Sequence, residues 1–227
     1  MTIAEQIIYE DNHLIAINKR CGQIVQGDKT GDVTLPDMIK AYMKERDGKP
    51  GNVFCGVIHR LDRPVSGVVL FAKTSKALSR MNDAVKQREM KKIYWAACKE
   101  APIPPEGRLE NWLTRDEKSN KAFVVNPLVG RKDATCKLAV LDYKVIGRSD
   151  GGYYIVEVEL HTGRHHQIRA QLANIGCPIK GDLKYGAQRS NPDGGISLHA
   201  RSITFVHPVR KEDVTIVAEP TDKCLII

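Results

Sequence analysis

The sequence predicts a protein of the α+β class, because strand patterns and helix patterns are both present but do not alternate regularly along the chain. The clearest strand runs from Tyr154 to Leu160, where every second residue is apolar and two glutamates stand between them. A helix pattern follows directly, since residues 168–175 carry an apolar stripe that Gly176 ends. A regular alternation of strands and helices would instead have indicated a doubly wound parallel sheet.

The other expected elements follow from the same patterns. Two short strands are expected within residues 6–18, separated by the turn signal Asp11-Asn12. The later elements, in chain order, are a helix at 35–43, a loop at 44–52, a strand at 68–72, a helix after the N-cap Ser75, and strands at 92–98, 197–206 and 213–218. Three prolines at 102–105 predict a loop between two subregions.

The chain is basic, with 35 lysines and arginines against 27 acids and a net charge of +8. This balance favours a polyanion such as nucleic acid as a partner, although many soluble proteins are basic for no specific reason. No apolar run approaches the ~20 residues that span a bilayer, and the N-terminus has no apolar signal core, so we expect a cytoplasmic protein with no membrane partner. The six cysteines lack metal-ligand spacing and lie in apolar stretches, which predicts mostly buried, reduced thiols.

A tight group of charged residues follows a short apolar run that ends at residue 58. The group consists of His59, Arg60, Asp62 and Arg63, and a proline and a glycine then turn the chain. A carboxylate on such a turn is held rigidly, and the flanking arginines favour its ionised form, which can act as a nucleophile in glycosyl chemistry. The alternative is an ordinary surface turn in which Asp62 pairs with its neighbours.

A second group, at residues 161–169, runs from the end of a strand into the start of a helix. Unsatisfied N–H groups and the helix dipole make such a start suitable for phosphate, and Arg164, His165 and His166 add donors for an RNA backbone. Arg169 lies at the edge of the apolar stripe, where a partly buried guanidinium needs a carboxylate. No acid lies one helical turn away, so the partner must come from elsewhere in the fold, and Asp62 is our candidate.

The histidines of this second group also allow a metal site to be considered. His161 and His165 are four residues apart, but Gly163 lies between them at the expected junction of strand and helix. No H-E-x-x-H motif or cysteine partner accompanies them. We expect no metal.

A third group is the segment KKIYWA at residues 91–96. On a strand, Tyr94 faces away from Ile93 and Trp95. A tyrosine can stack on a base and offer its hydroxyl as a hydrogen-bond donor or acceptor. The alternative is an ordinary core tyrosine.

Together these groups resemble the RluA branch of the RNA pseudouridine synthases. The similarity covers nearly the whole chain in the order of the family's motifs, which makes it a specific signal. The matching segments are IIYEDNHLIAINKRCGQIV at 7–25, VIHRLDRPVSGVVLFAKTSKA at 57–77, KKIYWA at 91–96, LHTGRHHQIRAQLANIGCPIKGDLKYGA at 160–187 and SLHARSITFVHP at 197–208. Two positions depart from the family pattern, with Val65 where a threonine is usual and Arg20 where a proline is usual. Neither carries a proposed catalytic atom.

The resemblance implies a single catalytic domain over residues 1–227, without the S4-type RNA-binding domain of some relatives. Its fold would be a mixed, largely antiparallel central sheet flanked by helices and loops. The reaction it implies is isomerisation of a flipped-out uridine to pseudouridine in structured ribosomal or transfer RNA, such as a stem-loop. We expect a monomer that needs no cofactor or metal, because the bond exchange is redox-neutral.

The resemblance also implies roles for individual residues. Asp62 matches the essential aspartate, which either attacks C1′ or assists formation of a glycal. Tyr94 matches the tyrosine that packs on the base, Arg169 the basic residue that pairs with the aspartate, and Arg60 the arginine beside the flipped nucleotide. The residues we expect to contact RNA are His59, Arg60, Arg63, Arg164, His165 and His166.

Two other functions remain open from the sequence. A non-catalytic RNA-binding protein on the same scaffold would not need Asp62, Tyr94 and Arg169 together. A glycosidase would need two carboxylates in its site and would have no use for the +8 charge. Aromatic residues make up only 6% of the chain, so recognition of RNA by shape and backbone is favoured over an extended stacking platform.

Overall fold

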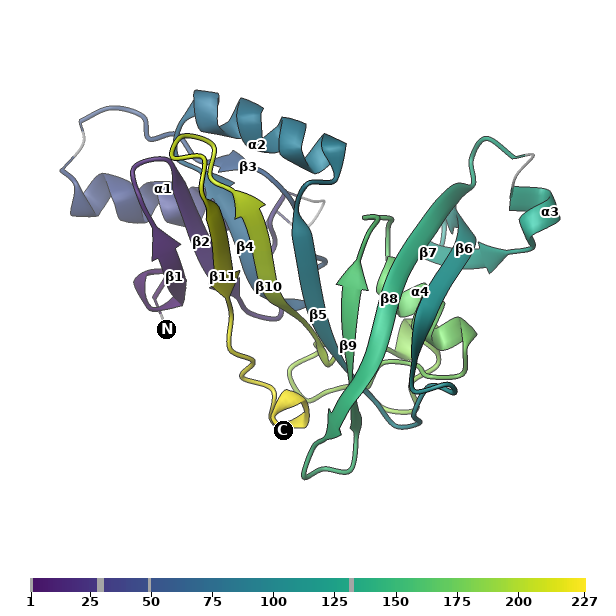
Figure 1. Ribbon diagram of the computed structural model, residues 1–227. Helices are drawn as coiled ribbons and strands as arrows, with labels where there is room; N and C mark the ends of the chain where they lie inside the picture. Colours follow the sequence, from purple (N-terminus) through teal and green to yellow (C-terminus); the bar gives the residue numbers. More distant parts are fainter. Residues whose placement is uncertain (1, 28–30, 49, 131–132) are drawn as a thin grey trace. The chain divides into compact units, whose positions relative to one another are not determined.

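The computed structural model describes residues 2–27, 31–48, 50–130 and 133–227. The chain divides into two compact units. The first unit comprises Met1–Lys91 and Ala200–Glu219, and the second unit comprises Lys92–His199 and Pro220–Ile227. Figure 1 shows the elements of both units, and each unit is described here by itself.

The first unit is built on a sheet with the strand order β1, β2, β4, β10. β11 pairs with β10, β3 pairs with β4, and the register of β1 with β2 and of β2 with β4 is antiparallel. The strands are β1 (Ile7–Glu10), β2 (Leu14–Lys19), β3 (Gly56–Val57), β4 (Ser66–Ala72), β10 (Leu198–Val206, of which the first two residues fall in the second unit) and β11 (Asp213–Val217). The helices are η1 (Ala4–Gln6), α1 (Leu35–Arg46) and α2 (Ser75–Gln87).

Local sequence signals explain where these two α-helices begin. The Thr34 side chain accepts a hydrogen bond from the Asp37 N–H at the start of α1. α1 continues to Arg46, three residues beyond the expected end at residue 43, so the loop expected from residue 44 was placed too early. The N-cap of α2 is Thr74 and not Ser75, because Thr74 has an extended backbone and its hydroxyl accepts from the Ala77 N–H.

The second unit is a five-stranded sheet with the order β5, β9, β8, β6, β7, in which all neighbouring strands are antiparallel. The strands are β5 (Lys91–Cys98), β6 (Glu106–Asp116), β7 (Lys121–Val125), β8 (Lys137–Arg148) and β9 (Tyr154–Leu160). The helical segments are α3 (Pro127–Gly130), α4 (Gln167–Asn174), η2 (Leu183–Tyr185) and η3 (Lys223–Leu225). The sequence predicted β5, β9 and α4 but not β6, β7 or β8.

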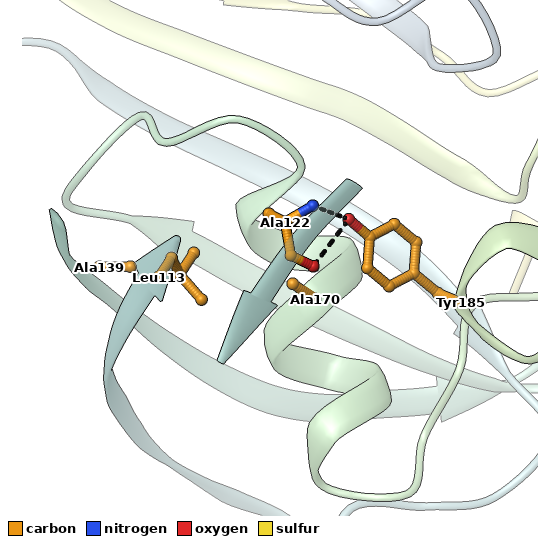
Figure 2. Close-up of a cluster of buried hydrophobic side chains, with 5 residues drawn as sticks. All are labelled: Leu113, Ala122, Ala139, Ala170 and Tyr185. Carbon is orange, nitrogen blue, oxygen red and sulfur yellow. Dashed lines mark hydrogen bonds between the residues drawn. The ribbon is translucent and has the colours of Figure 1, made fainter. Parts of the chain in front are cut away.

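Each unit has its own apolar core. In the first unit, β2 and β4 are buried along most of their length, and α2 packs against β4 and β3. In the second unit, α4 packs on the sheet through a small cluster that Figure 2 shows. Its members are Leu113, Ala122, Ala139, Ala170 and Tyr185. Such packing of helices on one face of an antiparallel sheet agrees with the α+β class.

The prolines at 102–105 do lie in a loop, between β5 and β6, but this loop is inside the second unit. The units meet along the chain at Lys91 and Lys92 instead, and again at His199 and Ala200. The expected subregion boundary was therefore wrong. Both junctions fall within strands, where the sequence has no proline or glycine to signal a break.

The thiols agree with the sequence-based expectation. Cys55, Cys98, Cys136 and Cys177 are buried, and the remaining two cysteines, Cys21 and Cys224, are half-buried. Burial raises the pKa of the Cys55 thiol to about 12, which keeps it protonated and unreactive. Across the described residues, we find no helix with the length and apolar character needed to cross a membrane.

The second residue of β4 is a glycine that no other residue can replace without strain. Gly67 has a φ of +112°, and a Cβ added there would lie 2.3 Å from the Ala200 carbonyl oxygen. We predict that Gly67→Ala lowers the free energy of unfolding by about 3 kcal/mol or more, because a backbone clash adds to the cost of the positive φ. Urea unfolding of the variant measures this decrease.

Gly22→Ala is the matched control for this prediction. Gly22 also has a positive φ, of +86°, but a Cβ there would meet nothing within 4 Å. The control should lose only the ~1–2 kcal/mol of left-handed strain. Equal decreases for the two variants would contradict the clash.

Candidate active site

Asp62 lies in the first unit, on the turn that connects β3 to β4, and its side chain is half-buried. The turn is fixed by backbone hydrogen bonds. The Val65 N–H donates to the Asp62 carbonyl at 3.1 Å, and the Gly22 N–H donates to the Arg63 carbonyl at 2.9 Å. The sequence-based expectation of a carboxylate on a tight turn is thus met.

A buried lysine that the sequence analysis missed holds this turn from inside. Lys19, the last residue of β2, is fully buried, and its ammonium donates to the carbonyls of Arg20 at 3.1 Å, Arg63 at 3.1 Å and Val65 at 2.6 Å. Burial lowers the pKa of Lys19 to about 8, and the negative charge of Asp62 is among the effects that oppose this shift. A lysine at the end of a largely apolar strand was the available signal. Lys19 therefore fixes the turn on which Asp62 lies and places a positive charge near it.

The three other polar side chains of this segment have separate contacts. The His59 ring accepts a hydrogen bond at Nε2 from the Leu70 N–H at 3.1 Å, so it helps to fix β4. The Arg63 guanidinium forms an ion pair with Asp32 at 2.8 Å. Arg60 is exposed and donates to the side chain of Gln26. Their expected contacts with RNA stay predictions.

Tyr94 and Arg169 lie in the second unit. Tyr94 is on β5 opposite Val158 of β9, and it is buried, whereas its neighbours Ile93 and Trp95 are half-buried. Trp95 faces the other way and donates from its indole to Glu157 at 3.1 Å. The expected alternation of the strand is confirmed.

Arg169, on α4, is held by an acid that the sequence analysis did not identify. Its Nε and Nη2 donate to the two carboxylate oxygens of Asp182 at 2.6 and 2.7 Å, and both side chains are buried. The guanidinium also lies 5.0 Å from the centre of the Tyr185 ring. A two-pronged pair of this kind fixes the plane of the guanidinium as well as its position. The pair expected between Arg169 and Asp62 would join the two units and stays a prediction.

Tyr185 contacts both Arg169 and the strand β7. Its hydroxyl accepts from the Ala122 N–H at 2.8 Å and lies 3.2 Å from the Ala122 carbonyl, as the dashed lines in Figure 2 show. The same hydroxyl lies 3.0 Å from Nδ1 of His166. Tyr185 thus joins η2, β7 and the start of α4.

His166 is buried and adopts the left-handed conformation, with a φ of 50°. Burial, and then the positive charges of Arg169 and His165 among others, lower its pKa to about 2. The imidazole is therefore neutral near pH 7. The sequence predicted a phosphate donor here, and the structure gives the ring a structural contact as well.

The start of α4 is partly occupied by its own side chains. Gln167 accepts at Oε1 from the Arg164 N–H at 3.0 Å and from the Thr162 hydroxyl at 2.8 Å. Arg164 itself donates to the Leu138 carbonyl at 2.9 Å. The N–H and the side chain of Arg164 thus both have partners within the protein. His161, considered above as a metal ligand, lies 2.6 Å from a carboxylate oxygen of Asp142.

Comparison with known proteins now adds to this geometry. A family model described as RNA pseudouridylate synthase matches residues 13–174. The chain is 32% identical over 216 residues to the ribosomal large subunit pseudouridine synthase C of Rickettsia bellii, covering 95% of this chain and 68% of that protein. It is 31% identical to an uncharacterized RNA pseudouridine synthase of Synechocystis, covering 93% of this chain and 64% of that protein. The chain thus spans about two thirds of the length of these relatives.

The fold has counterparts among solved structures. The human protein called RNA Pseudouridylate Synthase Domain Containing 4 matches with a TM-score of 0.78, over 96% of this chain and 90% of that chain. At 24% identity this likeness concerns the fold alone, and it confirms the expected class. Fold and sequence matches together define an isomerase that acts on RNA.

The chain belongs to the RNA pseudouridylate synthase family. Its activity is the isomerisation of uridine to pseudouridine in RNA, as the motif resemblance implied. The roles of the individual site residues are taken up below.

The buried pair on α4 gives a prediction about stability. We predict that Asp182→Asn lowers the free energy of unfolding by about 3–5 kcal/mol, because it removes the negative charge that Asp182 places against the buried Arg169 guanidinium. Glu106→Gln is the matched control, since Glu106 pairs with Lys144 on the surface and should lose ~1 kcal/mol or less. Urea unfolding of both variants measures the difference, and similar decreases would contradict the buried pair.

His166 gives a prediction about pH. Its folded pKa is far below the unfolded value, so the unfolded state takes up more protons and stability decreases as the pH falls below about 6.5. At about pH 5 this group alone should cost ~2 kcal/mol relative to about pH 8. His166→Asn keeps a residue that tolerates the left-handed backbone but does not titrate.

Urea unfolding at both pH values separates this effect from the other titrating groups, which the wild type and the variant share. The stability of the wild type should fall by about 2 kcal/mol more than that of His166→Asn between the two pH values. Parallel decreases in the two proteins would show that the ring is protonated in the folded state.

Proposed function

We propose that this enzyme converts uridines in structured ribosomal or transfer RNA to pseudouridine, with Asp62 as its nucleophile. The match of VIHRLDRPVSG to the family's aspartate motif is the observation that carries the assignment. The rigid turn held by Lys19 supports it, because a fixed carboxylate beside a positive charge is suited to attack. The names of relatives such as the Rickettsia bellii enzyme point to ribosomal RNA.

The reaction rearranges bonds within one nucleotide. The N1–C1′ bond breaks, the uracil turns, C5 forms a bond to C1′, and the proton on C5 moves to solvent while N1 gains one. Atoms and electrons balance without an oxidant, a reductant or a cofactor. Asp62 takes part either by attacking C1′, which forms a sugar ester, or by assisting formation of a glycal, and both routes fit one carboxylate.

We assign the other site residues by the motifs they match. Tyr94 packs on the uracil and is available to help move a proton. Arg169, fixed by Asp182, pairs with the Asp62 carboxylate. Arg60 lies beside the flipped nucleotide. These assignments require the two units to act together as one catalytic domain.

The stacking of the target uridine and the negative charge of RNA are both consistent with a basic enzyme. A stacked uridine cannot reach a carboxylate, so it must be flipped out at a cost of a few kcal/mol. The net charge of +8 supplies attraction to phosphates that does not depend on sequence and weakens with salt. We place His59, Arg63, Arg164, His165 and His166 along the RNA. We propose that the enzyme works as a monomer in the cytoplasm, where buried thiols stay reduced.

Asp62→Asn tests the nucleophile. We expect the variant to fold and to bind RNA but to release no tritium from RNA that contains 5-tritiated uridine, because an amide cannot replace the carboxylate at C1′. Asp83→Asn, an exposed aspartate of α2 in the same unit, is the control and should keep full activity. Release by Asp62→Asn at the wild-type rate would overturn the assignment.

A further inference from the structure

The turn between β6 and β7 gathers positive side chains from three elements around Asn120. Arg115, on β6, donates from Nη2 to the Asn120 side-chain oxygen at 2.8 Å. Lys184, on η2, donates to the carbonyls of Ser119 at 3.0 Å and Asn120 at 3.2 Å. His165, next to α4, places Nε2 3.5 Å from the same Asn120 carbonyl. Asn120 has a φ of 48°, a left-handed conformation that asparagine tolerates.

A further lysine extends the group on the second strand of the hairpin. The Lys121 ammonium lies 4.9 Å from the centre of the Tyr185 ring and 5.1 Å from that of Phe123. Tyr185 is itself fixed to β7 through the backbone of Ala122. The lysine therefore lies over an aromatic surface whose position is set by the fold.

We call Arg115, Lys121 and Lys184 the hairpin cations. Within the described part of the chain, none of the three forms an ion pair with a carboxylate. The nearest acids in the sequence are Asp116 and Glu117. Asp116 accepts from the Ser119 hydroxyl and the Lys118 N–H, and it follows Arg115 directly on a strand, where neighbours face opposite ways.

Like charges held close together repel one another, by about 1 kcal/mol for a pair 4 Å apart in water and more near a protein surface. Hydrogen bonds to carbonyl and amide oxygens hold Arg115 and Lys184 in place without neutralising them. Each keeps unused donors, because an ammonium has three and a guanidinium has five. Both side chains are exposed, so an anion from solution can reach them.

The lowered pKa of His166 agrees with this picture, since burial is its first cause and the charges of Lys184 and Arg115 are among the others. The positive charges of Lys184 and Arg115 therefore act at His166 in the folded protein. A group of preplaced, positively charged donors suits the oxygens of a phosphodiester better than the edge of a base.

We infer that the hairpin cations bind the phosphate backbone of the RNA substrate, next to the segment that carries His165. This deepens the proposed function and rests on RNA being the substrate. Interactions of this kind position the RNA without reading its sequence. Removing these charges should raise KM and leave kcat at saturating RNA unchanged, because none of the hairpin cations is among the residues assigned to the chemical step.

The test uses the full chain and a fluorescein-labelled RNA stem-loop over a series of KCl concentrations. Arg115→Gln with Lys184→Gln should bind this RNA about 10-fold more weakly. The slope of log affinity against log salt should fall by about 1 or 2, at ~0.7–0.9 for each phosphate that the variant no longer neutralises. Lys144→Gln, which removes a surface lysine paired with Glu106 in the same unit, is the control and should change neither quantity by much.

Further variants separate charge from local structure. Lys184→Arg should bind the RNA like the wild type, because arginine keeps the positive charge. Weak binding by this variant would show that the shape of the lysine matters and not its charge. Asn120→Gly keeps the left-handed backbone and the carbonyl for Lys184 but removes the amide that holds Arg115, so it should weaken binding less than the double variant. Melting temperatures close to that of the wild type would show that the hairpin remains folded.

The outcomes distinguish this inference from the proposed function. If the double variant binds the stem-loop with the affinity and salt slope of the wild type, the phosphate site is wrong, even where the wild type forms pseudouridine. If the wild type forms no pseudouridine but the double variant still binds RNA more weakly, the site stands and the proposed function fails.

Discussion

The buried pair of Arg169 and Asp182 is the interaction on which the second unit's part of the site depends. Burying either charge without an opposite charge would cost several kcal/mol. Two hydrogen bonds, of 2.6 and 2.7 Å, and the ring of Tyr185 compensate for that cost. The same interactions fix α4 against η2 and leave the guanidinium one orientation. A catalytic role for Arg169 needs such fixed geometry, since a small displacement of a charged group reduces its effect on a reacting carboxylate.

In the first unit, a buried lysine holds the turn that carries the charged residue Asp62. Lys19 lies inside the unit and satisfies its ammonium on three backbone carbonyls, two of which belong to the turn that carries Asp62. Each unit therefore positions its own proposed site residue, Asp62 or Arg169, by interactions made inside that unit. Preorganisation of this kind means that little side-chain ordering is left to be done when substrate binds.

How far the sequence predicted the structure depended on how local each signal was. β9 and α4 were predicted because period-2 and period-3.6 patterns are contained in short windows. β6 was missed because it carries only three large apolar residues among charged ones and stays largely exposed along most of its length. Asp182 was missed because Arg169 is 13 residues away, and Lys19 because two of its three carbonyl partners, at Arg63 and Val65, are more than 40 residues away. No local pattern encodes which distant oxygens a buried charge will meet. The motif resemblance predicted catalytic roles for Asp62, Tyr94 and Arg169 without indicating which residues hold them in place.

The exposed positions of β6, which obscured its apolar alternation, also allow the hairpin to present charged side chains to solvent. A strand that buried both faces would be apolar at every position and could not present Arg115 beside the turn at Asn120. The hairpin instead buries Leu113 and Ala122 against α4 and leaves its tip polar. Packing of the apolar end of the hairpin against α4 fixes the position of the turn at Asn120. Hydrogen bonds to that turn fix Arg115 and Lys184. An RNA backbone, whose charge is regularly spaced and does not depend on sequence, is the kind of ligand that such an arrangement can hold in register with α4.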